Sequence, residues 1–328
     1  MLDRLSRMLR FISRRLLQVI PLLLAITLIS FGVMQLAPGD YLDSLRGQPT
    51  IRPETIDKLR RDFGLDQPWY IQYVRWLGNA VQGDFGYSFT YKISAVTLIV
   101  QRLYYTFILS LWATIFAWTI AIPLGIYIAT HRNGWVDRIA NLIAFAGISL
   151  PGFFMALLAM KYAQQSGHFP VGGATSVGYD ALSHFDKIKD TAHHMVLPVL
   201  ILGIGGVAGL MRQMRGNVLE VLGEQYIMAA RARGLSERKV IYKHALRNAI
   251  NPLITLFGYT LSGLLAGAAL VENVMAWPGL GRLLLESVQG RDLYVAMASF
   301  VMGTVLLVLG NLVADVLLAL SDPRIKFS

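Results

Sequence analysis

The sequence predicts an all-α protein that crosses a membrane several times. Hydrophobic residues make up 55% of its 328 residues and charged residues only 15%, whereas soluble domains carry about 25% charged residues. Long uncharged apolar runs recur along the chain. Helices suit such runs because they satisfy their backbone hydrogen bonds without water. These observations favour a polytopic helical membrane protein over a soluble one.

Six runs without Asp, Glu, Lys or Arg are predicted as transmembrane helices. A helix needs about 20 residues to cross roughly 30 Å of hydrocarbon, and each run is that long. The first run ends in "LAPGD" and has no small-residue cleavage site, so we predict a retained helix rather than a signal peptide. The runs are Leu16–Gly39, Leu103–His131, Ile139–Met160, Thr191–Met211, Asn248–Val271 and Leu293–Ala314.

The distribution of Lys and Arg predicts that both termini are cytoplasmic. Basic residues gather in the N-terminal tail, in the second and fourth connections and in the C-terminal tail, whereas charges nearly balance in the other loops. Cytoplasmic loops carry the excess of Lys and Arg in membrane proteins. The formal net charge of +10 is therefore interpreted as a topology signal rather than as a sign of nucleic-acid binding.

Two parts are predicted along the chain. Residues 1–102 form an N-terminal transmembrane helix and a long external loop, and residues 103–328 form a five-helix core. The loop contains the segment "PETIDKLRRDFG", which predicts a helix from Pro53 that ends before Gly64.

A second external helix is predicted from Pro68 to about Val81. It carries a stripe formed by Trp69, Tyr73 and Trp76. One interpretation places this stripe at the membrane interface, where Trp and Tyr are enriched. The alternative is a docking platform for an external partner.

The sequence predicts no catalytic residues and no resident metal or cofactor. It contains no cysteine, no Walker A sequence, no G-x-S-x-G and no H-E-x-x-H. Adjacent His193 and His194 cannot share a helix face as ligands at i and i+4 do. His168 and His184 lie in one external loop and leave a metal option open.

The glycines of "GIGGVAG" superficially resemble a dinucleotide-binding fingerprint. They lie inside a predicted transmembrane run, however, and not between a strand and a helix. The pairs Gly205/Gly209 and Gly263/Gly267 are better interpreted as positions where helices pack closely.

Asp315 is a charge within the last apolar segment. Such residues are costly in a membrane and usually serve a function. Asn311 lies one turn earlier on the same face. Asp315 is therefore expected to pair with another helix or subunit, or alternatively to contact a substrate. Tyr162, Tyr259, Asn311 and Asp315 are the candidate residues of a translocation pathway.

A basic segment, "EQYIMAARARGLSERKVIYKHALRNAINP", separates two of the apolar runs. A helical pattern stops at Gly234, which permits a left-handed turn, and resumes after Ser236, a favourable N-cap. Two short helices joined by a tight corner would form a cytoplasmic knob near residues 224–247. A solvated loop explains the charge, but it does not explain the small Ala229, Ala230 and Ala232. A protein-docking knob is therefore favoured.

This segment resembles the cytoplasmic coupling motif of binding-protein-dependent ABC importer permeases. It is most similar to the B-type subunits of the oligopeptide, dipeptide and nickel group. The resemblance extends over nearly the whole chain through "LAPGD", "GLDQPWYIQYVRWLGNAVQGDFGYSF", "ENVMAWPGLGRLLLESVQGRD" and "DPRIKF". The family motif begins Glu-Ala-Ala, whereas this chain has Met228-Ala229-Ala230. A contact made through that Glu is therefore not carried over.

The resemblance implies a type I ABC importer permease, which is a non-catalytic subunit in a prokaryotic inner membrane. It implies four kinds of partner: a second permease subunit, two cytoplasmic ATP-binding subunits that hold ATP and Mg, an extracytoplasmic solute-binding protein, and membrane lipid. Di- or oligopeptides are the expected substrates, with nickel or another small solute as the alternative. An ATP-independent secondary carrier is the competing class, but it would place several charges near mid-membrane.

The resemblance also assigns an ATPase-coupling role to eight residues. Five of them form the docking core, namely Ala229, Ala230, Arg231, Gly234 and Leu235. The other three position the return into the fifth transmembrane run, namely His244, Asn248 and Pro252.

Overall fold

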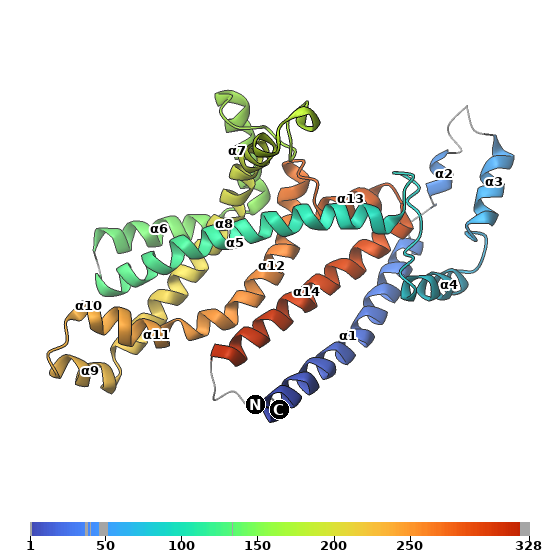
Figure 1. The fold of residues 1–328 in the computed structure, drawn as a ribbon. Helices are drawn as coiled ribbons and strands as arrows, with labels where there is room; N and C mark the ends of the chain where they lie inside the picture. Colours follow the sequence, from blue (N-terminus) through green and yellow to red (C-terminus); the bar gives the residue numbers. More distant parts are fainter. Residues whose placement is uncertain (1, 37–38, 40, 46–51, 133, 322–328) are drawn as a thin grey trace. The chain divides into compact units, whose positions relative to one another are not determined.

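The computed structural model describes residues 2–36, 39, 41–45, 52–132 and 134–321, with some side chains in α1, α2, α6, α12 and α14 left out of the description. Helices dominate this part of the chain (Figure 1). The only β-type pairing among the described residues is an isolated bridge between Tyr87 and Ser94. The predicted all-α class is confirmed for the described residues.

The chain divides into two compact units, which are treated separately below. Unit 1 contains Met1–Ile12, Phe107–Trp277 and Leu307–Ser328, and unit 2 contains Ser13–Thr106 and Pro278–Leu306. The predicted division at residue 102 was made from the order of apolar runs. It stays a prediction, because the two units are defined by contacts and combine segments that lie far apart in the sequence.

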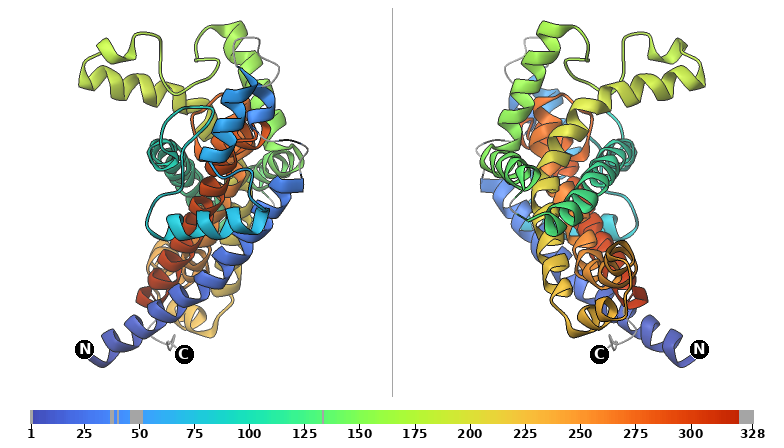
Figure 2. Two further views of the ribbon diagram at one scale, coloured as in Figure 1. Left: turned by 90° about the vertical axis from the view of Figure 1, so that its right-hand side faces the viewer. Right: turned by 90° about the vertical axis from the view of Figure 1, so that its left-hand side faces the viewer.

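Unit 1 is built around the long helix α8, against which α6, α7 and α12 pack. Its coupling segment follows α8 at one end, and the loop after α7 precedes α8 at the other end (Figure 2). Its helices are the start of α1 (Leu2–Leu36, up to Ile12), α5 (Ala95–Thr130, from Phe107 onward), α6 (Trp135–Ser149), α7 (Gly152–Ser166), η1 (Tyr179–Ala181), α8 (His184–Leu222), α9 (Gln225–Ala232), α10 (Glu237–Lys239), η2 (Val240–Ala245), α11 (Leu246–Ala249), α12 (Asn251–Val274) and the end of α14 (Leu293–Ser321, from Leu307 onward).

Four helices in the described residues, α1, α5, α8 and α14, are long and apolar enough to cross a membrane. They correspond to the predicted first, second, fourth and sixth runs. The predicted fifth run is also helical, because α12 covers Asn251–Val274. The surroundings of its middle part lie outside the description, so its membrane crossing and the close packing predicted at Gly263 and Gly267 stay predictions.

The prediction of one continuous helix over Ile139–Met160 is wrong. The chain breaks at Pro151, which separates α6 from α7 with extended backbone angles. Proline lacks the N–H that a continuing helix needs, and it disfavours helical angles at the preceding residue. α6 and α7 have 15 residues each. Each is therefore about 22 Å long and too short to cross the hydrocarbon alone.

Small residues bring the helices of unit 1 together. Buried alanines of α5, α6 and α8 form one apolar cluster. A Cβ added at Gly203 would lie 2.4 Å from the Phe116 ring, and one at Gly206 would lie 3.2 Å from Ala117. Gly205 and Gly209 have no such neighbour within 4 Å in the part of the chain that the structure describes. The close packing predicted for "GIGGVAG" is thus supported, but Gly203 and Gly206 make it instead of Gly205 and Gly209.

Unit 2 contains α1 from Ser13 onward, the helices that follow α1, and the segment around α13. The helix predicted from Pro53 is confirmed, and Gly64 follows it with a left-handed φ of +66°. The helix predicted near Pro68–Val81 is confirmed as α4. The helices are α1 (Leu2–Leu36, from Ser13 onward), α2 (Tyr41–Leu45), α3 (Pro53–Asp62), α4 (Trp69–Val81), the first part of α5 (Ala95–Thr130, up to Thr106), α13 (Leu280–Gln289) and the first part of α14 (Leu293–Ser321, up to Leu306).

The aromatic stripe of α4 faces the core of unit 2. Tyr73 and Trp76 are buried with Phe31 and Met297, and the Tyr73 hydroxyl lies 3.0 Å from Thr27 Oγ1. Aromatic residues with a polar atom are stable inside a protein when that atom finds a partner. Only Trp69 is well exposed, at 49%. Neither interpretation of the stripe as a surface feature therefore holds for Tyr73 and Trp76.

Candidate functional site

The candidate site is the coupling segment, which runs from α9 to the start of α12. Its predicted corner is confirmed at Gly234, which has a left-handed φ of +76°. The Gly234 N–H donates to the Arg231 carbonyl at 2.9 Å, so the turn closes directly on the end of α9. A Cβ at this position would meet no atom of the described residues within 4 Å. Glycine is required here for its backbone angles and not for space.

An ion pair crosses the corner. Arg231 donates to Glu237 through Nη2 at 2.6 Å and through Nε at 3.1 Å, which is the two-point geometry of strong Arg–carboxylate pairs. This hydrogen bond holds the pKa of Glu237 below its usual value. The sequence prediction missed Glu237 and assigned Arg231 to the docking core. The structure shows that the guanidinium is engaged within the corner itself.

A small apolar cluster lies beneath the corner. Ile227, Ala230, Val240 and Ala245 are buried there, and Leu235 packs against them. The alanines predicted to form one docking surface are therefore divided. Ala230 faces inward, whereas Ala229 and Ala232 are exposed. Met228, at the place of the family's Glu, is also 54% exposed.

The segment after the corner differs from a simple second helix. Ser236 occupies the N-cap position, as predicted, but its side chain makes no capping bond. Its carbonyl accepts from the N–H groups of Lys239 and Val240. The chain then forms a π-helical turn, η2, which carries the half-buried His244. π turns inside helices frequently occur at functional sites, and no sequence pattern predicted this one.

Two asparagines fix the return toward the membrane. Asn248 donates to the Tyr226 hydroxyl at 2.7 Å and so ties the end of the segment to α9. Buried Asn217 on α8 donates to the Ala249 carbonyl at 3.0 Å. In the turn that contains Pro252, the Leu253 N–H donates to the carbonyl of Ile250 and not to the carbonyl of Ala249. Asn217 therefore satisfies a carbonyl that the helix leaves open.

Asn217 and a second polar contact connect α8 to its surroundings, and the sequence prediction missed both. Gln213 donates to Asn217 Oδ1 at 3.0 Å. Arg215 pairs with buried Asp137 of α6 at 3.2 Å, and Asn141 donates to the same carboxylate. Arg215 and Asp137 are 78 positions apart in the sequence, so no local pattern could reveal the pair. The coupling segment is thus attached to a firmly connected α8.

The candidate pathway residues lie on three helices. Tyr162 on α7 is 56% exposed, with its ring centroid 6.3 Å from that of Phe169. Asn311 and Asp315 lie on α14 and are half-buried. Tyr259 is on α12, but its side chain lies outside the described residues. Their shared role as a pathway stays a prediction.

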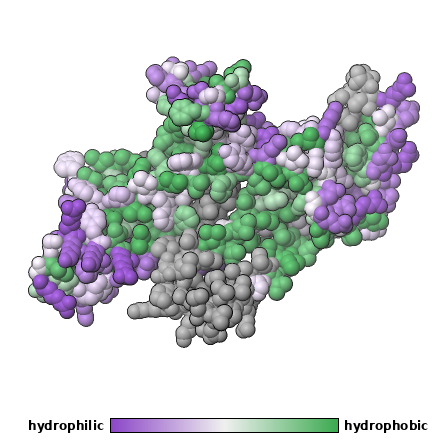
Figure 3. Space-filling model, in the orientation of Figure 1, coloured by the Kyte–Doolittle hydropathy of each residue, from purple (hydrophilic) through white to green (hydrophobic). Residues whose placement is uncertain are grey.

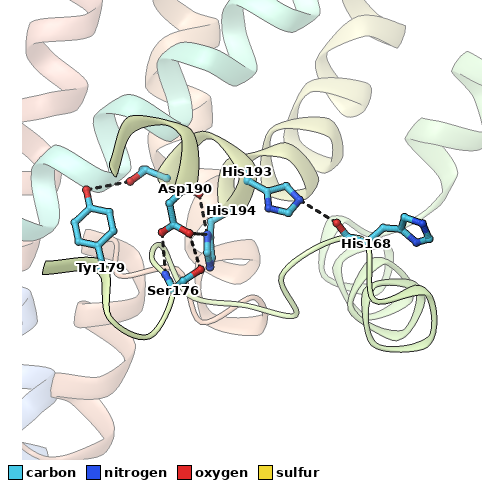
Figure 4. A network of polar contacts seen from close by, with 7 residues as sticks. His168, Ser176, Tyr179, Asp190, His193 and His194 are labelled. Atoms are coloured by element: carbon cyan, nitrogen blue, oxygen red, sulfur yellow. Dashed lines mark hydrogen bonds and ion pairs between the residues drawn. The ribbon is translucent and has the colours of Figure 1, made fainter. Parts of the chain in front are cut away.

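His193 and His194 make polar contacts that hold the loop after α7 (Figure 4). Asp190 accepts from the backbone and hydroxyl of Ser176, and His194 lies 3.8 Å from the same carboxylate. His193 donates through Nε2 to the His168 carbonyl at 2.9 Å. Among the described residues, no group of three or more His, Cys, Asp or Glu could hold a metal.

Known proteins resemble this chain over nearly its whole length. Residues 121–327 match the family described as binding-protein-dependent transport system inner membrane component, and residues 8–110 match the N-terminal part of such membrane components. The oligopeptide transport system permease protein AppB of Bacillus subtilis is 42% identical over 97% of this chain and 99% of its own. The dipeptide transport system permease protein DppB of Escherichia coli K12 is 36% identical over the same shares.

The fold also resembles that of a solved transporter. A chain of the MetNI methionine ABC transporter in an inward-facing conformation aligns with a TM-score of 0.54. The alignment covers 69% of this chain and 96% of that chain, at 18% sequence identity. At this identity the likeness concerns the fold alone.

Proposed function

Because this chain belongs to the binding-protein-dependent transport system inner membrane component family, we propose that it forms half of the pore of an importer for di- or oligopeptides. Relatives named for oligopeptide and dipeptide transport, matched over nearly their full length, support this substrate class. The other half of the pore is a second permease subunit. An extracytoplasmic binding protein delivers the solute.

The chain itself does not hydrolyse ATP in this proposal. Two cytoplasmic subunits bind ATP and Mg, and the permease lies in the inner membrane with both termini cytoplasmic. Six crossings are formed by α1, α5, α6 with α7, α8, α12 and α14. The basic connection between α5 and α6 and the basic coupling segment support this orientation.

The observation that carries the proposal is the construction of the corner. Gly234, the Arg231–Glu237 pair and the buried cluster make α9 and α10 one compact body. Asn248 ties α11 to α9, and Asn217 joins α11 to α8. Exposed Ala229 and Ala232 leave one face of α9 open to close approach by an ATPase subunit. Coupling requires that this contact differ between the two transport states. A compact body attached to a long membrane helix can transmit such a difference.

The proposal is tested by purifying the tagged chain in mild detergent and identifying what accompanies it. We expect a second permease and ATPase subunits, with ATP hydrolysis stimulated by peptide and the binding protein. Gly234→Val should lower recovery of the ATPase subunits by about ten-fold or more, while the chain still inserts, because a branched residue strains the left-handed corner by roughly 1–2 kcal/mol.

The matched control is Gly234→Asn at the same position. Asn tolerates left-handed angles, so this variant should keep most of the ATPase subunits. A chain that purifies alone and transports without ATP would instead establish a secondary carrier. Labelled dipeptide and nickel, supplied to the same complex in liposomes, separate the two substrate alternatives.

Tyr162, Tyr259, Asn311 and Asp315 are proposed to line the pathway. Their positions on α7, α12 and α14 of unit 1 support this role. Asp315→Asn should then change peptide uptake without changing recovery of the ATPase subunits. Loss of those subunits would instead indicate that Asp315 supports assembly.

A further inference from the structure

An open groove in unit 1 is not explained by the proposed coupling function. It lies between the last part of α5, the end of α8 and the segment from α10 to η2, and its volume is about 1360 Å³. Small-molecule sites usually measure about 300–1,000 Å³. The groove can therefore hold a ligand larger than most small molecules.

The polarity of the groove changes along α5. Ile120, Pro123 and Leu124 supply an apolar wall, which Leu219 and Leu222 of α8 continue. The end of α5 and the residues after it supply polar groups, namely Thr130, His131 and Arg132. Ile120 and Thr130 are about 15 Å apart along the helix. Figure 3 likewise shows hydrophilic residues over α9 and α10 beside hydrophobic surface on α5 and α6.

The polar end of the groove carries unbalanced positive charge. Its one acidic residue, Glu237, is already paired with Arg231. Arg132 and Arg238 also line the groove, and neither guanidinium group makes a hydrogen bond or ion pair with a described residue. Two guanidinium groups are thus available for an anion. A peptide zwitterion fits poorly, because its ammonium group would find no free carboxylate.

We propose that this groove binds an anionic phospholipid of the cytoplasmic leaflet. The phosphate lies between Arg132 and Arg238, and an acyl chain follows the apolar wall of α5 and α8. Guanidinium groups match phosphate geometry, and basic pockets between membrane helices bind anionic head groups on the cytoplasmic side. The proposal rests on the proposed function only for the orientation of α5. The lipid would touch the coupling corner, because Arg231 and Glu237 form part of the same wall.

The test measures phospholipid binding to the complex in nanodiscs that contain phosphatidylglycerol or phosphatidylcholine. Wild type should retain phosphatidylglycerol through detergent purification and prefer it to phosphatidylcholine. Arg132→Gln with Arg238→Gln should weaken phosphatidylglycerol binding by about thirty-fold, since each basic residue near the membrane surface contributes about five-fold. Replacement of both residues by Lys should keep most of the binding, because the charge remains.

A matched control removes the same charge outside the groove. Arg233 and Arg247 belong to the coupling segment, are exposed, and do not line the groove. Arg233→Gln with Arg247→Gln should bind phosphatidylglycerol as wild type does. Equal losses in the two double variants would mean a diffuse attraction to basic surface and would overturn the proposal.

Two other outcomes would also overturn it. Unchanged lipid binding with loss of ATPase subunits from the Arg132/Arg238 variant would make the groove a protein-docking surface. Unchanged lipid binding with weakened peptide retention would make it a peptide site. Lipid binding can also be measured on the chain purified without partners, so failure of the importer assignment is distinguishable from failure of the lipid proposal.

Discussion

Two charged regions outside the apolar helices, the surroundings of Asp292 in unit 2 and the corner at Gly234 in unit 1, differ in exposure. In unit 2, Asp292 is 1% exposed and accepts from Ser88 Oγ at 2.7 Å and from the Thr90 N–H at 3.1 Å. In unit 1, the Arg231 and Glu237 side chains of the corner are 40% and 56% exposed. The first region encloses its charge within the fold, and the second keeps its charge at the surface.

This difference separates residues that hold the fold from residues that remain available to partners. Removing a buried acceptor leaves its hydrogen-bond donors buried and unsatisfied, at a cost of roughly 1–3 kcal/mol for each donor. Exposed ion pairs contribute only about 0.2–1 kcal/mol. Changes around Asp292 should therefore alter stability, whereas changes in the corner should alter coupling in a chain that remains folded.

The largest effect is expected for Asp292→Ala. It leaves Ser88 Oγ and the Thr90 N–H without their shared acceptor, so the free energy of unfolding should fall by about 3 kcal/mol. The measurement is unfolding of the purified chain in detergent. Glu54→Gln, on the exposed side of α3, should change stability by less than about 0.5 kcal/mol. Equal stability of the two variants would contradict the enclosed role of Asp292.

The next effect concerns the attachment of the corner to α8. Asn217→Ala leaves the buried Ala249 carbonyl without its donor, at a local cost of about 1–3 kcal/mol. ATPase subunits should still bind, but peptide transported per ATP should fall by about ten-fold, within the usual range of coupling energies. Gln213→Ala is the control, because it removes only the neighbour of Asn217. Loss of ATPase subunits from Asn217→Ala would show that the residue supports assembly rather than transmission.

Tyr91 gives unit 2 a dependence on alkaline pH. Its hydroxyl donates to Glu286 Oε2 at 2.6 Å, and burial together with that carboxylate raises its pKa to about 12. The folded state therefore holds this proton more tightly than the unfolded state, whose pKa is near 10. The stabilisation is present below pH 10 and is lost as the pH rises toward 12.

Tyr91→Phe should accordingly lower the free energy of unfolding by about 1 kcal/mol at pH 7. The difference between the variant and wild type should shrink between pH 10 and 12, as followed by unfolding in detergent at each pH. A difference that stays constant over this range would mean that the Glu286 contact does not depend on the Tyr91 proton.

Sequence reasoning succeeded where the signal is local and failed where it is distant. Gly234 and the helical pattern before it predicted the corner, because turn geometry depends on a few adjacent residues. Pro151 was a local signal too, but the apolar pattern across it outweighed the proline. Asn217 had no signal, because its partner is a backbone carbonyl 32 positions away. Ser88 and Asp292 are 204 positions apart, so only the fold brings them together.

The smallest effect is expected for Glu237→Gln, which removes the ion pair of the exposed corner. Stability should fall by about 0.2–1 kcal/mol and less in high salt, because water replaces the lost partner. The pKa of Glu237 is lowered by Arg231 from a usual value of 4.5. The pair therefore contributes above pH 4.5 and is lost as the pH falls through the lower folded-state pKa.

Retention of ATPase subunits by wild type should accordingly be constant from about pH 5 to 8, and it should be slightly lower and equally constant in Glu237→Gln. The measurement is subunit recovery at each pH, with Glu220→Gln on α8 as the matched control because it removes an acid outside the corner. A large loss of subunits from Glu237→Gln alone would show that the carboxylate itself contacts the ATPase. In that case the corner would resemble the enclosed region of unit 2 once its partner is bound, and the contrast between the units would hold only for the isolated chain.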